Sequence, residues 1–165
     1  MKQLLEQRKG GNVKRFHTLN MHREHLVSSH SWGVAIIVIH IHPECSTRLL
    51  KAALWHDIPE YVTGDVSAVT KWDYPMLAKA VSKVEEAVIK DLGIGIDLMP
   101  FERDILKVAD MTDLILCCLE EYSLGNQEAF VIAQRGMDYL NSKDYEATMV
   151  NDFVARLNIY VQTGN

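Results

Sequence analysis

The stretch His56-Asp57-Ile58-Pro59-Glu60-Tyr61-Val62-Thr63-Gly64-Asp65 places one histidine and three acids within ten residues. The run that precedes it, Leu49 to Trp55, consists mainly of strong helix formers. We therefore expect His56 and Asp57 to lie at the end of a largely buried helix, about 100° apart around its axis. Their side chains could converge on one cation, or His56 could instead satisfy the last carbonyl groups of the helix.

Length and composition bound the class of protein. The 165 residues are 48% hydrophobic and 24% charged, as in an ordinary water-soluble protein, and we expect a single domain over residues 1–165. The net charge of −5 gives no support for a nucleic-acid-binding surface. Three cysteines form no disulfide framework, which favours a cytoplasmic protein. No apolar run is long enough to span a bilayer, so we expect no membrane association.

Hydrophobic periodicity predicts helices along most of the chain. Residues 30–41 could form a strand or a buried helix, and the lack of a second strand-like run favours the helix, capped by Ser28 or Ser29. Residues 20–29 and 66–74 are expected to be irregular. Further helices are expected over 75–92, 101–121 and 127–140 and from about residue 144. The predicted architecture is all-α, a single-domain helical bundle.

The helix expected over 75–92 has a clear apolar stripe and ends at Gly93. We expect this stripe to face the core. Its members are Leu77, Ala80, Val84, Ala87 and Val88.

Two polar residues lie on apolar stripes of the other predicted helices. His30 shares a helix face with Val34, and Asp110 has Leu106 four residues before it and Leu114 four residues after it. An ionised carboxylate in such a position is costly by several kcal/mol unless a partner compensates for it. Asp110 could also face water, if only one side of its helix is buried. A bound cation would remove the cost.

His30, the pair His56 and Asp57, and Asp110 together offer two imidazoles and two carboxylates. This nitrogen and oxygen set suits manganese, iron, cobalt, zinc or nickel better than calcium, and it lacks the cysteine ligands of a structural zinc site. On an octahedral ion, four protein ligands would leave two positions for water and substrate, as a catalytic site requires. Glu60 could act as general base on that water, or it could be an exposed acid at a helix end.

The order His … His-Asp … Asp resembles that of the HD-domain metal-dependent phosphohydrolases, over roughly residues 12–115. The resemblance looks closest to the small 5′-deoxynucleotidase branch and its short phage relatives, which are dATP triphosphohydrolases. The matching elements are Arg15-Phe16, Val27-Ser28-Ser29-His30-Ser31, His56-Asp57-x-x-Glu60-x-x-x-x-Asp65 and Lys71. Two positions depart from the pattern, since relatives usually have Trp at Phe16 and often Glu at Ser29.

The resemblance implies that His30, His56, Asp57 and Asp110 hold a divalent metal ion, which could be cobalt, manganese, zinc or magnesium. It also implies that Glu60 works on the attacking water. These assignments agree with the chemistry of the donor set, because phosphoester hydrolysis needs an activated water and neutralised phosphoryl oxygens.

The resemblance assigns the substrate contacts as well. Arg15 and Lys71 would contact phosphate, although each alone could be a solvated surface charge. Asp65 would meet the 3′-hydroxyl of the sugar and Phe16 would pack near its 2′ position. Thr18 could line the base pocket.

The implied activity is the hydrolysis of a small-molecule deoxynucleotide at the α-phosphorus, which releases the deoxynucleoside. The short chain favours a dNTP (dATP) triphosphohydrolase, and the alternative is a 5′-deoxynucleotidase acting on dNMPs. A cyclic or signalling nucleotide phosphodiesterase is disfavoured by Arg15, Asp65 and Lys71, and a non-catalytic nucleotide sensor is disfavoured by the intact Glu60. We also expect a homo-oligomer, a dimer or larger, because apolar surface near the C-terminal helix remains to be covered.

Overall fold

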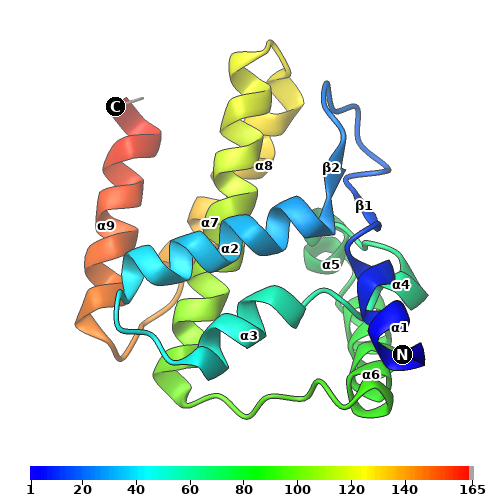
Figure 1. Cartoon of the computed structure of the whole chain (residues 1–165). Coiled ribbons are helices and arrows are strands. Elements are labelled where there is room, and N and C mark those ends of the chain that lie inside the picture. Colours follow the sequence, from blue (N-terminus) through cyan, green and yellow to red (C-terminus); the bar gives the residue numbers. More distant parts are fainter. Residues whose placement is uncertain (164–165) are drawn as a thin grey trace.

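The computed structural model describes residues 1–163. Within that range the regular structure is helical except for one very short antiparallel strand pair (Figure 1), and the all-α prediction is confirmed. The elements in order are α1 (Lys2–Gly10), β1 (Lys14–Arg15), β2 (His25–Leu26), α2 (Val27–Ile41), α3 (Thr47–Trp55), α4 (Glu60–Thr63), α5 (Ala68–Asp73), α6 (Pro75–Leu92), α7 (Pro100–Ser123), α8 (Gln127–Asn141) and α9 (Thr148–Thr163).

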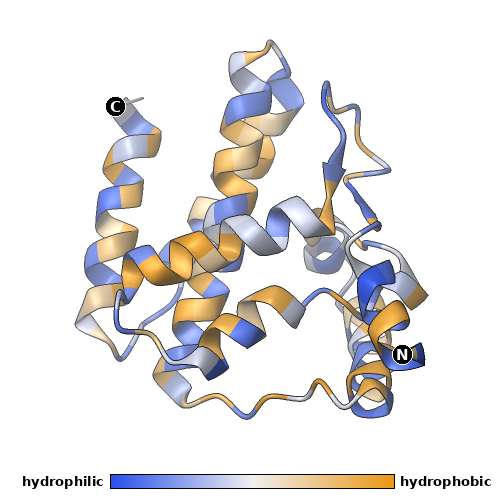
Figure 2. Cartoon of the chain, in the orientation of Figure 1, coloured by the Kyte–Doolittle hydropathy of each residue, from blue (hydrophilic) through white to orange (hydrophobic). Residues whose placement is uncertain are grey.

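The longest helix, α7, lies at the centre of the bundle, where α8 and α2 pack against it and α2 in turn packs against α3 (Figure 1). Val34 and Val38 of α2 and Ile105, Val108 and Ile115 of α7 are fully buried. Figure 2 shows the C-terminal half of α2 and the adjoining part of α7 as strongly apolar. The predicted helix over 101–121 is therefore the central element of the core, and it carries Asp110.

Several helix boundaries follow from the local sequence. Ser46 caps α3, where its Oγ accepts a hydrogen bond of 3.1 Å from the backbone N–H of Leu49. Pro75 and Pro100 occupy the first turns of α6 and α7, where a missing N–H costs nothing. Gly93 ends α6 in the left-handed conformation, with φ 62°.

The segment before His30 differs from the prediction. The helix α2 begins at Val27, so that His30 lies in its first turn and neither Ser28 nor Ser29 caps it. The reason is tertiary: β1 pairs with β2, and the N–H of Val27 then donates to the carbonyl of Val13 at 3.0 Å. Residues 66–74 are likewise not irregular, because Ser67 caps the short helix α5.

The predicted core stripe of α6 is wrong. Leu77 is 43% exposed and Val84 is 42% exposed, whereas Val81 is buried. Its main packing contacts within residues 1–163 are with the small elements α1, α4 and α5, so its buried side is set by these contacts rather than by its apolar periodicity.

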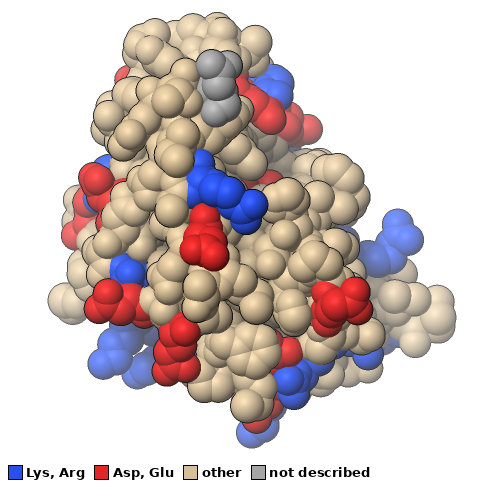
Figure 3. All heavy atoms as spheres, turned by 90° about the vertical axis from the view of Figure 1, so that its left-hand side faces the viewer, with Lys and Arg blue, Asp and Glu red and all other residues tan. Residues whose placement is uncertain are grey.

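Exposed apolar residues also occur on α9, where Ile159 is 60% exposed and Tyr160 is 43% exposed. Figure 3, which looks onto the side of the molecule that carries α9, shows acidic and basic side chains interspersed among large uncharged areas. The homo-oligomer stays a prediction. No helix within residues 1–163 is long and apolar enough to cross a membrane.

Candidate active site

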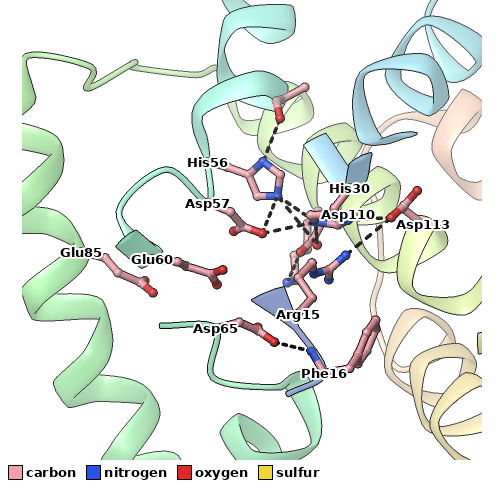
Figure 4. A network of polar contacts seen from close by, with 12 residues as sticks. Arg15, Phe16, His30, His56, Asp57, Glu60, Asp65, Glu85, Asp110 and Asp113 are labelled. Carbon is pink, nitrogen blue, oxygen red and sulfur yellow. Dashed lines mark hydrogen bonds and ion pairs between the residues drawn. The ribbon is translucent and has the colours of Figure 1, made fainter. Parts of the chain in front are cut away.

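Four side chains from three helical segments converge on one point. His30 comes from α2, His56 and Asp57 directly follow α3, and Asp110 comes from α7 (Figure 4). One ligand atom each of His30, His56 and Asp110 lies within 4.8 Å of the others. Asp57 belongs to the same group, because its Oδ2 lies 3.3 Å from His30 Nε2 and 3.4 Å from His56 Nε2.

These distances are those expected around a metal ion. Donor atoms about 2.1 Å from one ion stand roughly 3.0 to 3.4 Å apart when they are neighbours and about 4.2 Å apart when they are opposite. The two Nε2 atoms of His30 and His56 are 3.2 Å apart, and His30 Nε2 is 3.2 Å from Asp110 Oδ1. His56 Nε2 and Asp110 Oδ1 are 3.9 Å apart. The residues present therefore fit a divalent transition metal.

The two imidazoles are held by their other ring nitrogens. His56 Nδ1 lies 2.8 Å from the carbonyl oxygen of Ala53, so His56 does satisfy a carbonyl at the end of α3 and still turns Nε2 toward the cluster. His30 Nδ1 lies 2.6 Å from Asp113 Oδ2. When Nδ1 donates in this way, the lone pair of the imidazole resides on Nε2 and is available to a metal.

The charges of the cluster are strongly coupled. Burial would lower the pKa of His30, but its hydrogen bonds with Asp110, Asp113 and Asp57 outweigh burial and raise the pKa to about 10. Burial would raise the pKa of Asp110, yet Lys107 and the histidines hold it well below its usual value. Without a cation, a protonated His30 thus serves as the counter-charge of the carboxylates. A divalent ion would replace that proton.

A cavity of about 80 Å³ adjoins the cluster. Its lining includes the predicted metal ligands Asp57 and Asp110 and four further residues predicted to act on the water or the substrate. These are Arg15, Glu60, Asp65 and Lys71. Residues far apart in sequence, from Arg15 to Leu114, are thus brought to one small space, whose apolar lining is Val66, Ala68, Met111 and Leu114.

Glu60 begins α4 and is buried, with 3% of its surface exposed, so it is not an exposed acid at a helix end. Its Oε1 lies 3.9 Å from Lys71 Nζ, and its Oε2 has no hydrogen-bond partner within the described part of the chain. Burial, assisted by Asp57 and Asp65, raises the pKa of Glu60 to about 9. A cation at the cluster would offset the charge of Asp57 and so lower the pKa of Glu60.

Arg15 is not a solvated surface charge, because only 8% of its side chain is exposed. Its NH1 lies 3.6 Å from Asp113 Oδ2, and its Nε has no partner among residues 1–163. A buried guanidinium with an unused donor is suited to an incoming anion. Lys71 is one-third exposed and lies 3.9 Å from both Glu60 Oε1 and Glu85 Oε1.

Phe16 and Asp65 are directly linked. Phe16 has a left-handed backbone with φ 58°, which is unusual for an aromatic residue, and its N–H donates to Asp65 Oδ2 at 2.9 Å. The ring of Phe16 is buried and packs edge-on against His25, 5.5 Å between centroids. One oxygen of Asp65 therefore already holds the backbone of Phe16.

Two of the predicted substrate contacts are placed differently from the others. Phe16 does not contribute to the lining of the 80 Å³ cavity, although it adjoins Arg15 and Asp65, which do. Thr18 is exposed and lies outside this cavity, and its place in a base pocket stays a prediction. The apolar wall of the cavity near the cluster is formed by Val66, Ala68, Met111 and Leu114.

Sequence reasoning missed Asp113 and Lys107, which contact His30 and Asp110 respectively. Lys107 was detectable as a cation three residues before Asp110 on the same helix face. A larger hollow of about 440 Å³ borders the far side of His30 and Arg15, but Asp57 and Glu60 do not line it. The smaller cavity is accordingly the candidate active site.

Comparison with known proteins assigns this chain to a family. Residues 8–100 match the model of the YfbR-like 5′-deoxynucleotidases. A 5′-deoxynucleotidase of Vibrio vulnificus is 32% identical over 139 residues, which cover 68% of this chain and 70% of that protein. One of Vibrio cholerae is 33% identical over 106 residues, which cover 55% of this chain and 54% of that protein. The chain thus spans only about half the length of the second relative.

A solved structure has the same fold. The HD phosphohydrolase DatZ of cyanophage S-2L, bound to dA and one catalytic Zn²⁺ ion, superposes with a TM-score of 0.70 over 96% of this chain and 95% of that chain. The two sequences are 16% identical. This likeness confirms the expected HD-type helical bundle.

Proposed function

Because the chain belongs to the YfbR-like family of 5′-deoxynucleotidases, we propose that it hydrolyses the 5′ phosphoester of a deoxynucleoside monophosphate to a deoxynucleoside and inorganic phosphate. The observation that carries the proposal is the meeting of Glu60, Arg15 and Lys71 with the ligand cluster in one cavity. That set contains the groups needed to activate a water and to neutralise a phosphate.

His30, His56, Asp57 and Asp110 would hold the metal ion. A divalent ion there would lower the pKa of a water and offset charge on the phosphoryl oxygens. Zinc is the first ion to test, because the cyanophage relative holds zinc, and cobalt, manganese and magnesium follow.

Glu60 would act as the general base. Its unpartnered Oε2 can accept the proton of the attacking water while the new bond from oxygen to phosphorus forms. The bond from phosphorus to the 5′ oxygen then breaks, and that oxygen leaves with the electron pair and takes up a proton. A base whose pKa lies above its ordinary value is well matched to work near neutral pH.

Arg15 and Lys71 would bind the phosphate from two sides. The buried guanidinium of Arg15 offers its free Nε, and Lys71 contributes a mobile point charge beside Glu60. Asp65 would accept a hydrogen bond from the 3′-hydroxyl through the oxygen that does not hold Phe16. Phe16 would restrict the space at C2′ and so disfavour ribonucleotides.

The relatives change the order of the two leading substrates. From the sequence, the short length of the chain favoured hydrolysis of dATP to triphosphate. The curated relatives are named 5′-deoxynucleotidases, which supports the alternative, a monophosphate substrate. Both reactions attack the same phosphorus, so the ligand cluster and Glu60 would serve either one.

The test is an incubation of purified protein with dAMP, dATP and the matching ribonucleotides, each with zinc, cobalt, manganese or magnesium, followed by separation of products. We expect deoxyadenosine and phosphate from dAMP. Triphosphate from dATP, with dAMP left intact, would establish the other substrate. Binding of nucleotides without any product would overturn the enzyme assignment, and Glu60→Gln serves as the matched inactive control.

A further inference from the structure

The carboxylate of Asp113 lies behind the predicted metal ligand His30 (Figure 4). Its Oδ2 is 2.6 Å from His30 Nδ1, the shortest contact that this imidazole makes, and 3.6 Å from Arg15 NH1. Asp113 comes from α7, one turn after Asp110, so the same helix presents one acid to the metal side of the ring and another to its back.

The opposite helix leaves space for this carboxylate at a glycine. Gly33 lies in α2 one turn after His30, and a Cβ atom added to it would overlap Asp113 Oδ1 and stand 2.9 Å from Asp113 Cγ. A glycine inside a helix costs about 1 kcal/mol relative to alanine. The close approach of Asp113 to the backbone of α2 explains why a glycine is present at position 33 despite this cost.

We propose that Asp113 is a positioning residue for the metal-binding imidazole of His30, and that Gly33 is required to admit it. The carboxylate accepts the Nδ1 proton of His30, which fixes the tautomer with its lone pair on Nε2 and holds the ring plane against the cluster. This inference rests on the proposed metal site, of which His30 is a ligand.

The contact to Arg15 adds a second consequence. One oxygen of Asp113 faces both the imidazole and the guanidinium, so the position of the metal ligand and the position of the phosphate-binding cation are tied to a single carboxylate. Loss of Asp113 is therefore expected to affect metal binding and substrate binding together, whereas loss of Glu60 affects neither.

The decisive variant is Gly33→Ala, with Gly95→Ala as its control. The added methyl of Gly33→Ala meets the mobile end of a side chain, so the carboxylate can swing away and the fold survives, but the contact with His30 is lost. At Gly95 the methyl would meet only Ile89 Cγ2, at 3.5 Å. The measurement is zinc affinity of the metal-free protein by chelator competition, together with thermal unfolding of the metal-free protein.

We expect Gly33→Ala to bind zinc about 10- to 100-fold more weakly, as is usual when the partner of a ligand histidine is lost. Its metal-free form should remain folded, because alanine favours the helix and so offsets part of the contact with His30 that is lost. Gly95→Ala should bind zinc like wild type. Equal zinc affinity in wild type and Gly33→Ala would overturn the proposal, as would a loss of affinity that merely follows a loss of stability.

A double variant shows whether Gly33 and Asp113 affect zinc binding through the same contact or independently of each other. Asp113→Ala should weaken zinc binding to the same degree as Gly33→Ala, and adding Gly33→Ala to it should cause no further loss, since the contact is already gone. Additive losses would refute the link between Gly33 and Asp113. If wild type binds no divalent ion at all, the proposed metal site fails before this question is reached, so the two failures are distinguishable.

Discussion

The substitution Glu121→Gln tests how the segment between α1 and α2, which carries the predicted substrate contacts Arg15 and Phe16, is held. Glu121 is fully buried in the last turns of α7. Its carboxylate accepts hydrogen bonds from the backbone N–H of His22 at 2.6 Å and from Arg23 Nε at 2.9 Å, and it lies 3.2 Å from His25 Nε2. His25 in turn supports the ring of Phe16. One acid thus attaches residues 22–25 to the core.

The size of the effect follows from the charge. Burial would raise the pKa of Glu121, but the donors of His22, Arg23 and His25 outweigh burial and lower the pKa from 4.5 to about 2. That difference corresponds to roughly 3 kcal/mol of preference for the ionised form in the folded protein. The neutral amide introduced by Glu121→Gln would lose the charge that these donors stabilise. Its NH₂ group would also face N–H donors, with which it cannot form a hydrogen bond. We expect Glu121→Gln to lower the free energy of unfolding by about 2 to 3 kcal/mol.

The neighbouring acid supplies the control. Glu120 pairs with the same Arg23 at 2.9 Å, but its side chain is 64% exposed, so Glu120→Gln should change stability by less than about 1 kcal/mol. Urea unfolding at pH 7 measures both variants. Equal midpoints for the two would refute the reasoning, because burial of the carboxylate would then contribute nothing.

The lowered pKa of Glu121 also predicts how the stability of the protein depends on pH. Because the folded pKa of Glu121 is depressed, its contribution is complete above about pH 4.5 and is lost as the pH falls toward 2. The stability difference between wild type and Glu121→Gln should therefore shrink between pH 5 and pH 2. A difference that stays constant over this range would show that the charge of Glu121 is not its cause.

Three further predictions concern the site. Glu60→Gln should lower kcat at least about 100-fold with little change in substrate affinity, measured by turnover and by binding of the unreacted nucleotide. Phe16→Ala should reduce a preference for deoxy- over ribonucleotides that we expect to be about tenfold or more in wild type, measured as the ratio of kcat/KM values; an unchanged ratio would remove Phe16 from sugar selection. Removal of the metal by chelation should lower Tm by roughly 5 to 10 °C relative to protein with zinc at about 100 times its Kd, and Asp57→Ala should lose this shift and the activity together.

The helices and the ligand cluster were predictable because each depends on local periodicity. His30 and Asp110 interrupt apolar stripes of α2 and α7, and the pair His56-Asp57 ends a strong helix-forming run. The helix α7 is long enough for periodicity to indicate which face is buried, whereas α2 was predicted as a helix because no second strand-like run could pair with it. The stripe of α6 shows the limit of this reasoning, since that helix has no large element to cover it and Leu77 lies exposed.

The segment between α1 and α2 could not be predicted in the same way. Its residues have no period, and their positions depend on partners far along the chain: Glu121 for residues 22–25 and Asp65 for the backbone of Phe16. The polar groups of this segment therefore find their partners only after α7 and residue 65 are in place. Glu121 and Asp65 are buried, whereas His22 and Arg23 remain exposed. Thr18 lies in this segment, and its assignment to the base pocket stays a prediction.

Asp113 was missed although a signal for it existed. Read by itself it is an ordinary polar residue on a helix that already contributes Asp110, and nothing in its own surroundings marks it. The signal lies in α2, where Gly33 stands inside the helix, one turn after a predicted metal ligand. Because a helix tolerates glycine only at a cost, a glycine there indicates that something approaches the backbone closely. A ligand histidine needs a partner for its second nitrogen. Together these two requirements predict an acceptor from a neighbouring helix opposite Gly33, and the acid one turn beyond Asp110 is placed to provide it.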